Sequence, residues 1–186
     1  MNQKILVWPN QKLRKVSESV DSADSVSGLI KDLIDTCNVA MGAGLAAPQI
    51  GVAKQVAVIR PKVFGLENPD PSEYNSDYMV MINPSWEPQG EEIQWKEGCL
   101  SLPGVEGNVT RKEHCLLKYT TETGEERRMI AEWPFSGGIQ HECDHLLGKL
   151  FIHRMEKKKA AFLLERHRRK KRKALIKAKR ARKGIK

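Results

Sequence analysis

The residues best suited to chemistry in this chain form the run His141-Glu142-Cys143-Asp144-His145. On a helix, positions i and i+4 lie on one face a turn apart, so both imidazoles could reach one metal ion. Glu142 would lie about 100° around the helix from His141, because a helix has about 3.6 residues per turn. There it could exchange a proton with a metal-activated water without being a ligand. The alternative is an ordinary amphipathic helix with two surface histidines.

Two histidines are too few for a catalytic metal site, which usually has three protein ligands and one open position. The third ligand could come from any of four other residues: Cys99, His114, His153 and Glu165. Glu165 follows His145 by 20 residues, as in thermolysin-like peptidases, but it lies in a basic stretch typical of a solvated helix. Cys99 has better surroundings, since Gly98 lets the backbone approach a ligand closely and Pro103 ends the segment.

Three motifs in a fixed order give the chain a specific resemblance. Residues 42–49 read G-A-G-L-A-A-P-Q, residues 97–101 read E-G-C-L-S, and residues 140–145 read Q-H-E-C-D-H. They resemble the G-x-G-L-A-A-x-Q, E-G-C-L-S and Q-H-E-x-D-H motifs of the peptide deformylase family. The likeness extends over residues 4–155, and three ordered motifs with almost no mismatch exclude coincidence.

The resemblance implies a metallohydrolase that removes the formyl group from the N-terminal formylmethionine of newly synthesised polypeptides and releases formate. It implies one divalent metal ion per chain, Fe²⁺ natively with Zn²⁺, Ni²⁺ or Co²⁺ as substitutes, and the ligands Cys99, His141 and His145. Glu142 is expected to act as general base and then as general acid. The side-chain amide of Gln49 and the backbone N–H of Leu100 are expected to stabilise negative charge on the formyl oxygen.

The resemblance also implies that six residues lie against the substrate: Gly42, Ala43, Gly44, Glu97, Gly98 and Gly138. Without a Cβ, a glycine segment can lie alongside a peptide and pair with it as an added strand. A lone Gly-x-Gly would otherwise be read as a helix cap and turn. Many members of the family carry bulky apolar residues where this chain has Gly137 and Gly138. We therefore predict a roomier pocket for the first substrate side chain.

Helices and strands must position these residues, and hydropathy periodicity indicates where they lie. Apolar residues at three- and four-residue spacing predict a helix over residues 27–38. Further helices are expected over 139–147 and 155–183. The N-terminal and C-terminal helices would then flank a central helix that carries both histidines.

Strands are predicted over five segments rich in β-branched or alternating residues: 55–59, 78–82, 91–95, 114–119 and 127–133. The last two flank a turn and should form a hairpin. Asn83-Pro84 is expected to end the second strand, and residues 65–77 to form a surface loop. The order indicates an α+β fold, with antiparallel sheets packed around the metal-binding helix.

Charge is distributed unevenly along the chain. Residues 157–186 carry 16 of the 32 basic residues but one of the 23 acidic ones, a charge of +15 against +9 for the whole chain. We predict a catalytic domain over 1–155 and a basic helix or tail over 156–186, pinned to the body by Phe162, Leu163 and Leu164. Such runs are usually solvated. The sharper interpretation is contact with ribosomal RNA or protein near the exit of the nascent chain, as in some members of that family.

Other classes of protein explain the sequence less well. A nonenzymatic RNA-binding protein would account for the basic tail but leaves the three motifs unexplained. No apolar run reaches the roughly 18 residues that a membrane helix needs, and the first residues lack a secretory signal. The four cysteines are expected to act singly rather than as disulfides. We expect a cytoplasmic enzyme of bacterial type, or its organellar or viral equivalent, without a membrane partner.

Overall fold

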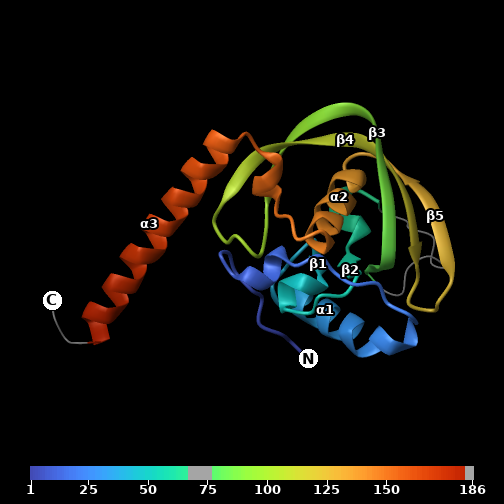
Figure 1. Cartoon of the computed structure of the whole chain (residues 1–186), viewed down its shortest axis with the longest axis horizontal. Helices are drawn as coiled ribbons and strands as arrows, with labels where there is room; N and C mark the ends of the chain where they lie inside the picture. The colour runs from blue at the N-terminus through green and yellow to red at the C-terminus, as the bar shows by residue number, and fades with distance from the viewer. Residues whose placement is uncertain (67–76, 183–186) are drawn as a thin grey trace.

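The computed structural model of the chain describes residues 1–66 and 77–182. Within these residues, one five-stranded antiparallel sheet has the order β1-β2-β3-β4-β5, so each strand pairs with its neighbours in sequence. The strands are β1 (Gly44–Ala46), β2 (Val56–Ile59), β3 (Met79–Gly98), β4 (Glu106–Thr120) and β5 (Glu126–Ala131). Figure 1 shows β3 and β4 as a long curved hairpin that arches over the body.

Helix α2 (Phe135–Leu146) lies beneath this arch, and nearly all of its residues are buried. Gln140 ties the helix to β4, because its Nε2 donates to the Lys112 carbonyl oxygen at 2.8 Å. Just after the helix, Gly148 has φ +68°, and a Cβ there would lie 2.4 Å from the carbonyl oxygen of Arg14. The face of α2 that packs into the main core consists of Phe135, Ile139, Cys143 and Leu146.

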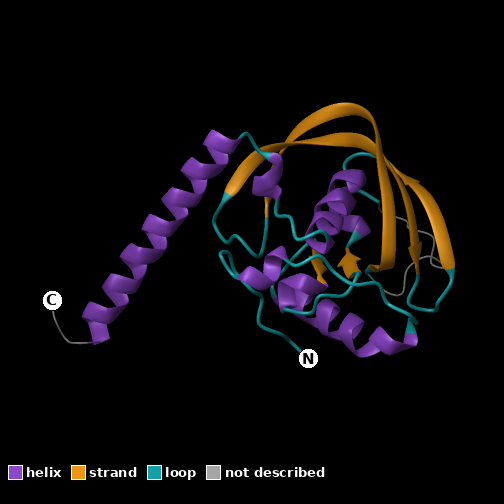
Figure 2. Cartoon of the chain, in the orientation of Figure 1, coloured by secondary structure: helices purple, strands orange, loops and turns teal. Residues whose placement is uncertain are grey.

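Strand β2 lies between two helices, which explains its uninterrupted apolar sequence. Successive side chains of a strand point to opposite faces. Ala57 and Ile59 therefore join the core beneath α2, whereas Val56 and Val58 join a second core that contains α1 (Ser27–Val39). Figure 2 shows helices on both sides of this part of the sheet. The central helix is thus held by a layer that is itself fully buried.

The predicted fold class is confirmed, since the structure is α+β with an antiparallel sheet around a central helix. The prediction that Asn83-Pro84 ends a strand is wrong. The strands predicted over 78–82 and 91–95 are parts of β3, which continues through a register shift between Ile82 and Ser85. A bulge absorbs the φ of +48° at Asn83 and the proline without ending the strand. Residues 67–76 of the predicted loop lie outside the described residues.

Helix α2 also begins earlier than predicted, at Phe135 rather than at residue 139. Gly137 and Gly138 both lie inside this helix. A Cβ on Gly137 would lie 2.8 Å from the Trp133 ring, and one on Gly138 would lie 2.5 Å from the Phe64 ring. Aromatic rings packed against the backbone therefore explain why glycine is present at both positions.

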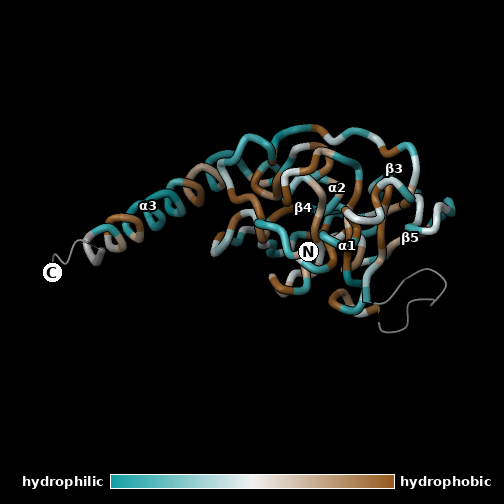
Figure 3. The backbone as a smooth tube through the Cα atoms, turned by 90° about the horizontal axis from the view of Figure 1, so that it is seen from below, coloured by the Kyte–Doolittle hydropathy of each residue, from teal (hydrophilic) through white to brown (hydrophobic). Residues whose placement is uncertain are grey.

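Helix α3 (Lys157–Arg182) projects away from the body (Figure 1), and hydrophilic residues predominate along it (Figure 3). Leu163 and Leu164 pack on a third core, as predicted. Phe162 does not, because 68% of it is exposed. Further along, the ring of Trp8 meets the His167 ring edge-on, with centroids 6.4 Å apart, and the Arg168 guanidinium at 4.8 Å. No helix in the described part of the chain is long and apolar enough to span a membrane.

Candidate metal centre and active site

Two histidines from one helix and one cysteine from the end of a strand meet beneath the β3–β4 arch. His141 and His145 lie one turn apart on α2, with ring centroids 5.0 Å apart. Cys99 follows the last residue of β3, and its Sγ lies 3.3 Å from Nε2 of His145. The three potential ligand atoms lie within 4.8 Å of one another. This group of residues is hereafter called the metal triad.

The metal triad fits a divalent transition-metal ion. Thiolate and imidazole ligands suit iron, cobalt, nickel and zinc, and three protein ligands are typical of a catalytic centre. Burial lowers the pKa of His145, and the nearby His141 and Arg111 act in the same direction. The His145 ring therefore stays neutral, which is the form that binds a metal. For His141, burial lowers the pKa, but the hydrogen bonds to Cys99 and Glu97 outweigh it and raise the pKa well above its ordinary value, so a metal would displace a proton there. The described residues thus offer a donor set suited to the ion.

Glu97 fixes the orientation of the first histidine. Its Oε2 lies 2.7 Å from Nδ1 of His141, so the ring can donate from Nδ1 and present Nε2 to a metal. Arg111 binds the same carboxylate through Nε at 2.7 Å and Nη2 at 3.1 Å. Burial alone would raise the pKa of Glu97, but the hydrogen bonds from His141 and Arg111 outweigh it and lower this pKa to about 2. Glu97 is therefore ionised across the ordinary pH range.

Glu142 lies beside the metal triad with one oxygen free. It is 5% exposed, and its Oε2 has no hydrogen-bond partner among the described residues. Burial raises its pKa to about 7. Such a carboxyl group can both accept and release a proton near neutral pH, as a general base that later acts as an acid requires.

Gln49 faces the metal triad from the segment that follows β1. Its Oε1 accepts a hydrogen bond from the Ala46 N–H at 2.8 Å, which fixes the orientation of the amide. Its Nε2 then points toward Cys99 Sγ at 3.5 Å and donates to Ser101 Oγ at 3.2 Å. Leu100 lies between these two residues, directly after Cys99. The predicted oxyanion donors are thus adjacent to the predicted metal ligands.

The six predicted substrate residues fall into three groups. Gly42, Ala43 and Gly44 lead into β1, which occupies the edge of the sheet. Glu97 and Gly98 end β3, but the Glu97 carboxylate is buried and engaged by His141 and Arg111. Gly138 lies on α2 against Phe64. The geometry therefore favours the β1 segment as the surface along which a peptide would lie.

The glycines on α2 do not leave the open space that the sequence suggested. Trp95 and Trp133 form an edge-to-face pair with ring centroids 4.7 Å apart, and both approach Gly137. Phe64 fills the corresponding place at Gly138. Aromatic rings from other elements thus fill the space beside both glycines. The glycines therefore do not by themselves enlarge a pocket, in contrast to what the sequence had suggested.

The other candidate ligands lie elsewhere. Glu165 is on α3, where its Oε1 accepts a hydrogen bond from Arg169 at 2.9 Å. His153 accepts a hydrogen bond from the Leu150 N–H at its Nδ1. His114 lies next to Glu113 on β4. Among the described residues, the group able to hold a metal contains Cys99 and not Glu165, so the arrangement of a thermolysin-like peptidase is absent there.

Sequence reasoning missed Arg111 and Ser101, which help to hold the centre together. Arg111 comes from β4, outside all three motifs, and no local pattern distinguishes it from other basic residues. Ser101 belongs to the second motif and could have been singled out as a polar residue near the cysteine. It is fully buried, and its carbonyl oxygen accepts a hydrogen bond from the Trp8 N–H at 2.9 Å.

Comparison with known proteins agrees with this geometry. A family model described as polypeptide deformylase matches residues 2–161. The chain is 40% identical over 150 residues to peptide deformylase of Stutzerimonas stutzeri, covering 80% of this chain and 83% of that protein. It is 41% identical over 160 residues to peptide deformylase 1 of Prochlorococcus marinus, covering 82% and 80%.

Solved structures give the same result. Peptide deformylase from Ehrlichia chaffeensis superposes with a TM-score of 0.81 at 31% identity, covering 94% of this chain and 99% of that one. The enzyme from Synechococcus elongatus, solved in complex with actinonin, gives 0.77 at 34% identity, covering 89% and 85%. Sequence, fold and the conjunction of a cysteine with two helical histidines thus lead to one assignment: the chain belongs to the polypeptide deformylase family.

Proposed function

We propose that this chain hydrolyses the formyl amide at the N-terminus of formylmethionyl peptides, releasing formate, and that the metal triad is its reaction centre. The observation that supports this assignment best is the convergence of three ligand atoms within 4.8 Å, next to a buried carboxyl group with a free oxygen. Membership of the family makes the chain a hydrolase of this class.

We propose that Cys99, His141 and His145 bind one divalent ion, with Fe²⁺ as the native ion and Zn²⁺, Ni²⁺ or Co²⁺ as substitutes. The thiolate and imidazole donors support such a choice, since they suit these ions better than Mg²⁺ or Ca²⁺. When bound, the ion supplies a Lewis acid that makes a water molecule acidic enough to react near neutral pH.

The residues of the chain account for the proton transfers and charge stabilisation. Glu142 accepts the proton of the attacking water at Oε2 and later donates it to the nitrogen of the departing amine. Negative charge that develops on the formyl oxygen is stabilised by two hydrogen-bond donors. These donors are Nε2 of Gln49 and the backbone N–H of Leu100. Gln49 needs no reorientation, because the Ala46 N–H already holds its Oε1.

The substrate backbone is proposed to pair with β1. This strand pairs with β2 on one side and is the end strand in the order of the sheet. A peptide added along Gly42, Ala43 and Gly44 would extend the sheet by one strand. Gly98 and Gly138 would then border the reacting end, with Glu97 held beneath them. This arrangement brings the formyl group next to Glu142, because Gly44 contacts that side chain.

Formate release from formyl-Met-Ala-Ser, measured with iron-loaded and zinc-loaded protein, tests the proposed function. We expect Cys99→Ser to abolish turnover and to weaken metal retention. Glu165→Gln is the matched control and should leave both unchanged, since Glu165 lies on the exposed side of α3. An active Cys99→Ser variant together with an inactive Glu165→Gln variant would favour a peptidase-like centre instead.

For the basic segment, we propose that residues 1–155 form the catalytic domain and that residues 156–186 form an appendage that binds the ribosome. The basic, largely hydrophilic helix that leaves the body supports this (Figure 3). Binding through counterion release should weaken as salt rises. Removing residues 172–186 keeps the contacts of Arg168 and Lys171 with Trp8. The truncated chain should retain peptide turnover but lose ribosome co-sedimentation, and unchanged co-sedimentation would contradict the proposal.

The cytoplasm is the proposed location. The metal triad needs a cysteine thiolate, and the four cysteines of the chain are all free. A reducing compartment keeps such thiols available, and nascent formylated peptides would be encountered there.

A further inference from the structure

Asp144 is a buried acid with no role in the proposed hydrolysis. It lies on α2 between the two histidines of the metal triad and is 1% exposed. Two guanidinium groups bind its carboxylate. Arg111 donates from Nη1 to Oδ2 at 2.6 Å, and Arg154 donates from Nε to Oδ2 at 3.0 Å and from Nη2 to Oδ1 at 2.5 Å. These contacts hold the pKa of Asp144 below its usual value, although burial alone would raise it.

These residues form one continuous chain of charged contacts that ends at a metal ligand. Arg154 binds Asp144, Asp144 binds Arg111, Arg111 binds Glu97, and Glu97 binds Nδ1 of His141. The side chains of Arg111, Glu97 and Asp144 are each no more than 3% exposed, whereas that of Arg154 is 39% exposed. This series of charged contacts therefore runs from the surface of the protein to the metal triad.

The hydrogen bonds of Arg111 show why Arg154 affects the contact between Arg111 and Glu97. Arg111 uses Nε and Nη2 on Glu97 and only Nη1 on Asp144, and Arg154 supplies the two-pronged contact that Asp144 would otherwise lack. Two carboxylates are thus balanced by two guanidinium groups. Without Arg154, a single buried cation would serve both acids, and leaving a buried carboxylate short of partners is costly. Arg111 would then shift toward Asp144 and loosen its contact with Glu97.

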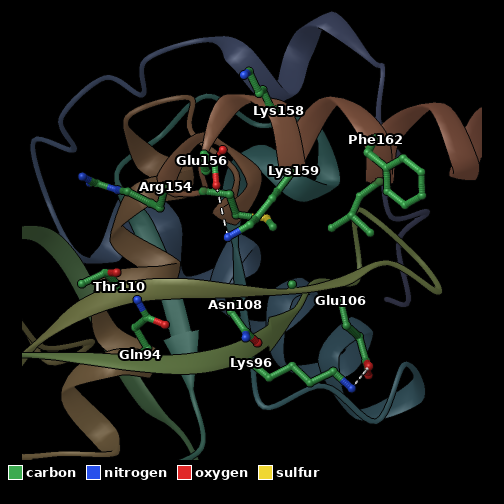
Figure 4. A pocket seen from close by; sticks show the side chains of 13 residues that line it. Gln94, Lys96, Glu106, Asn108, Thr110, Arg154, Glu156, Lys158, Lys159 and Phe162 are labelled. Atoms are coloured by element: carbon green, nitrogen blue, oxygen red, sulfur yellow. Dashed lines mark ion pairs between the residues drawn. The ribbon is translucent and has the colours of Figure 1, made fainter.

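Two residues, Met155 and Glu156, separate Arg154 from α3 (Lys157–Arg182). Arg154 lines a groove of about 770 Å³ between the β3–β4 hairpin and the first turns of α3, together with Thr110, Glu156 and Lys159. Figure 4 shows Arg154 beside Glu156 at the start of the helix. Arg154 is therefore not a member of the metal triad, and it contacts α2 at Asp144.

We infer that Arg154 is a positioning residue for the metal centre, acting through Asp144, Arg111 and Glu97 on the ring of His141. The inference depends on the proposed function, because it takes His141 to be a metal ligand. Residues that orient a ligating histidine through hydrogen bonds typically change metal affinity or activity by about 10- to 100-fold when replaced. Arg154 acts through three intervening side chains, so we expect the lower part of that range.

The test compares Arg154→Met and Arg154→Lys with Lys158→Met, an exposed cation that lines the same groove. The zinc-loaded enzymes are mixed with a chelator, and the rate of zinc loss is followed. We expect Arg154→Met to lose zinc about tenfold faster than wild type. Lys158→Met should match wild type. Arg154→Lys should lie between them, because lysine keeps the charge but not the two-pronged geometry.

Two further measurements separate positioning from general stability. In the zinc-loaded enzyme, proton NMR should show the Nδ1–H of His141 far downfield, and this signal should move in Arg154→Met but not in Lys158→Met. In the kinetics, kcat for formyl-Met-Ala-Ser should fall while KM stays within twofold of wild type. If Arg154→Met is poorly folded, a double-mutant cycle of Asp144→Asn and Arg154→Lys replaces it. The effects of these two substitutions on the rate of zinc loss should then be non-additive.

The inference is overturned if Arg154→Met keeps wild-type zinc loss, NMR signal and kcat. The proposed function fails separately, if Cys99→Ser retains the metal and the activity. A loss of melting temperature in Arg154→Met without a change in zinc loss would show that the ion chain only stabilises the fold, and this too would overturn the inference.

Discussion

A Cβ built on Gly44 would lie 2.6 Å from Oε1 of Glu142 and 2.8 Å from its Cδ. No real Cβ tolerates such contacts, so the first residue of β1 must be glycine if the carboxyl group of α2 is to keep its place. The first motif of the sequence and the third therefore meet at this point. The glycine at this position allows the proposed base and the proposed substrate-binding strand to be neighbours.

Gly44→Ala should lower kcat for formyl-Met-Ala-Ser by displacing Glu142. General acid–base groups contribute about 10²- to 10⁴-fold, so a misplaced Glu142 should cost up to about 100-fold. Gly28→Ala is the control, because an added Cβ on that residue of α1 meets nothing within 4 Å. A Gly44→Ala enzyme with wild-type kcat would show that the carboxyl group has another position from which to work.

Gln49→Glu should remove the oxyanion donor while leaving the local structure in place. The Oε1 of glutamate can still accept from the Ala46 N–H, but a carboxylate offers no N–H in place of Nε2. Loss of one such donor typically lowers kcat by about 10²- to 10³-fold. Ser101→Ala, which removes the neighbouring hydroxyl, is the comparison and should change kcat much less. Equal effects of both substitutions would contradict the role assigned to the amide.

Docking of α3 on Trp8 should weaken at acidic pH. Burial lowers the pKa of His167 from its ordinary value of 6.5, and Lys171 and Lys170 add to the effect. The undocked helix therefore binds more protons in the window between the lowered pKa and 6.5, so acid favours undocking. Docking is complete above that window and is lost as the pH falls through it.

Hydrogen exchange in the first turns of α3, followed from pH 7.5 to 5, measures this docking. Protection should fall in the wild-type chain below about pH 6.5, the ordinary histidine value. His167→Phe keeps an aromatic ring against Trp8 but cannot take up a proton, so its protection should not depend on pH in this range. A wild-type profile that is flat after correction for the intrinsic exchange rate would disprove the idea.

Gly138→Ala should destabilise the fold even though alanine favours helices. The helical preference contributes at most about 1 kcal/mol, whereas an overpacked core site costs about 1–3 kcal/mol. The clash with the Phe64 ring at 2.5 Å makes the second effect the larger one. Urea unfolding should show the loss, and the double variant with Phe64→Leu should recover part of it. An additive double variant would mean that Phe64 does not cause the loss.

The helical period was enough to predict that His141 and His145 lie on one face. The third ligand stayed open among four residues until the resemblance to the deformylase motifs pointed to Cys99, and the structure brings this residue together with both histidines. The prediction of an α+β fold is confirmed for a related reason, since alternating and helical patterns were strong in β2 and α1.

What the sequence could not reveal depends on residues that are far apart in the chain. Arg111 and Arg154 meet Asp144 only because β4 and the segment after α2 are folded together. The clash that requires Gly138 comes from Phe64, 74 positions earlier in the sequence. Asn83-Pro84 failed as a strand end because pairing with β4 on both sides of the bulge outweighs the local preference to break. Tertiary partners, not local propensities, decide such points.

Arg154 completes the series of charged contacts that leads to His141. It is also the last residue before the two-residue linker into α3. Binding of the ribosome to this basic helix, as proposed above, would restrain the backbone beside Arg154 without contact with the metal triad. The lifetime of the metal in the enzyme would then differ between the free and the ribosome-bound states.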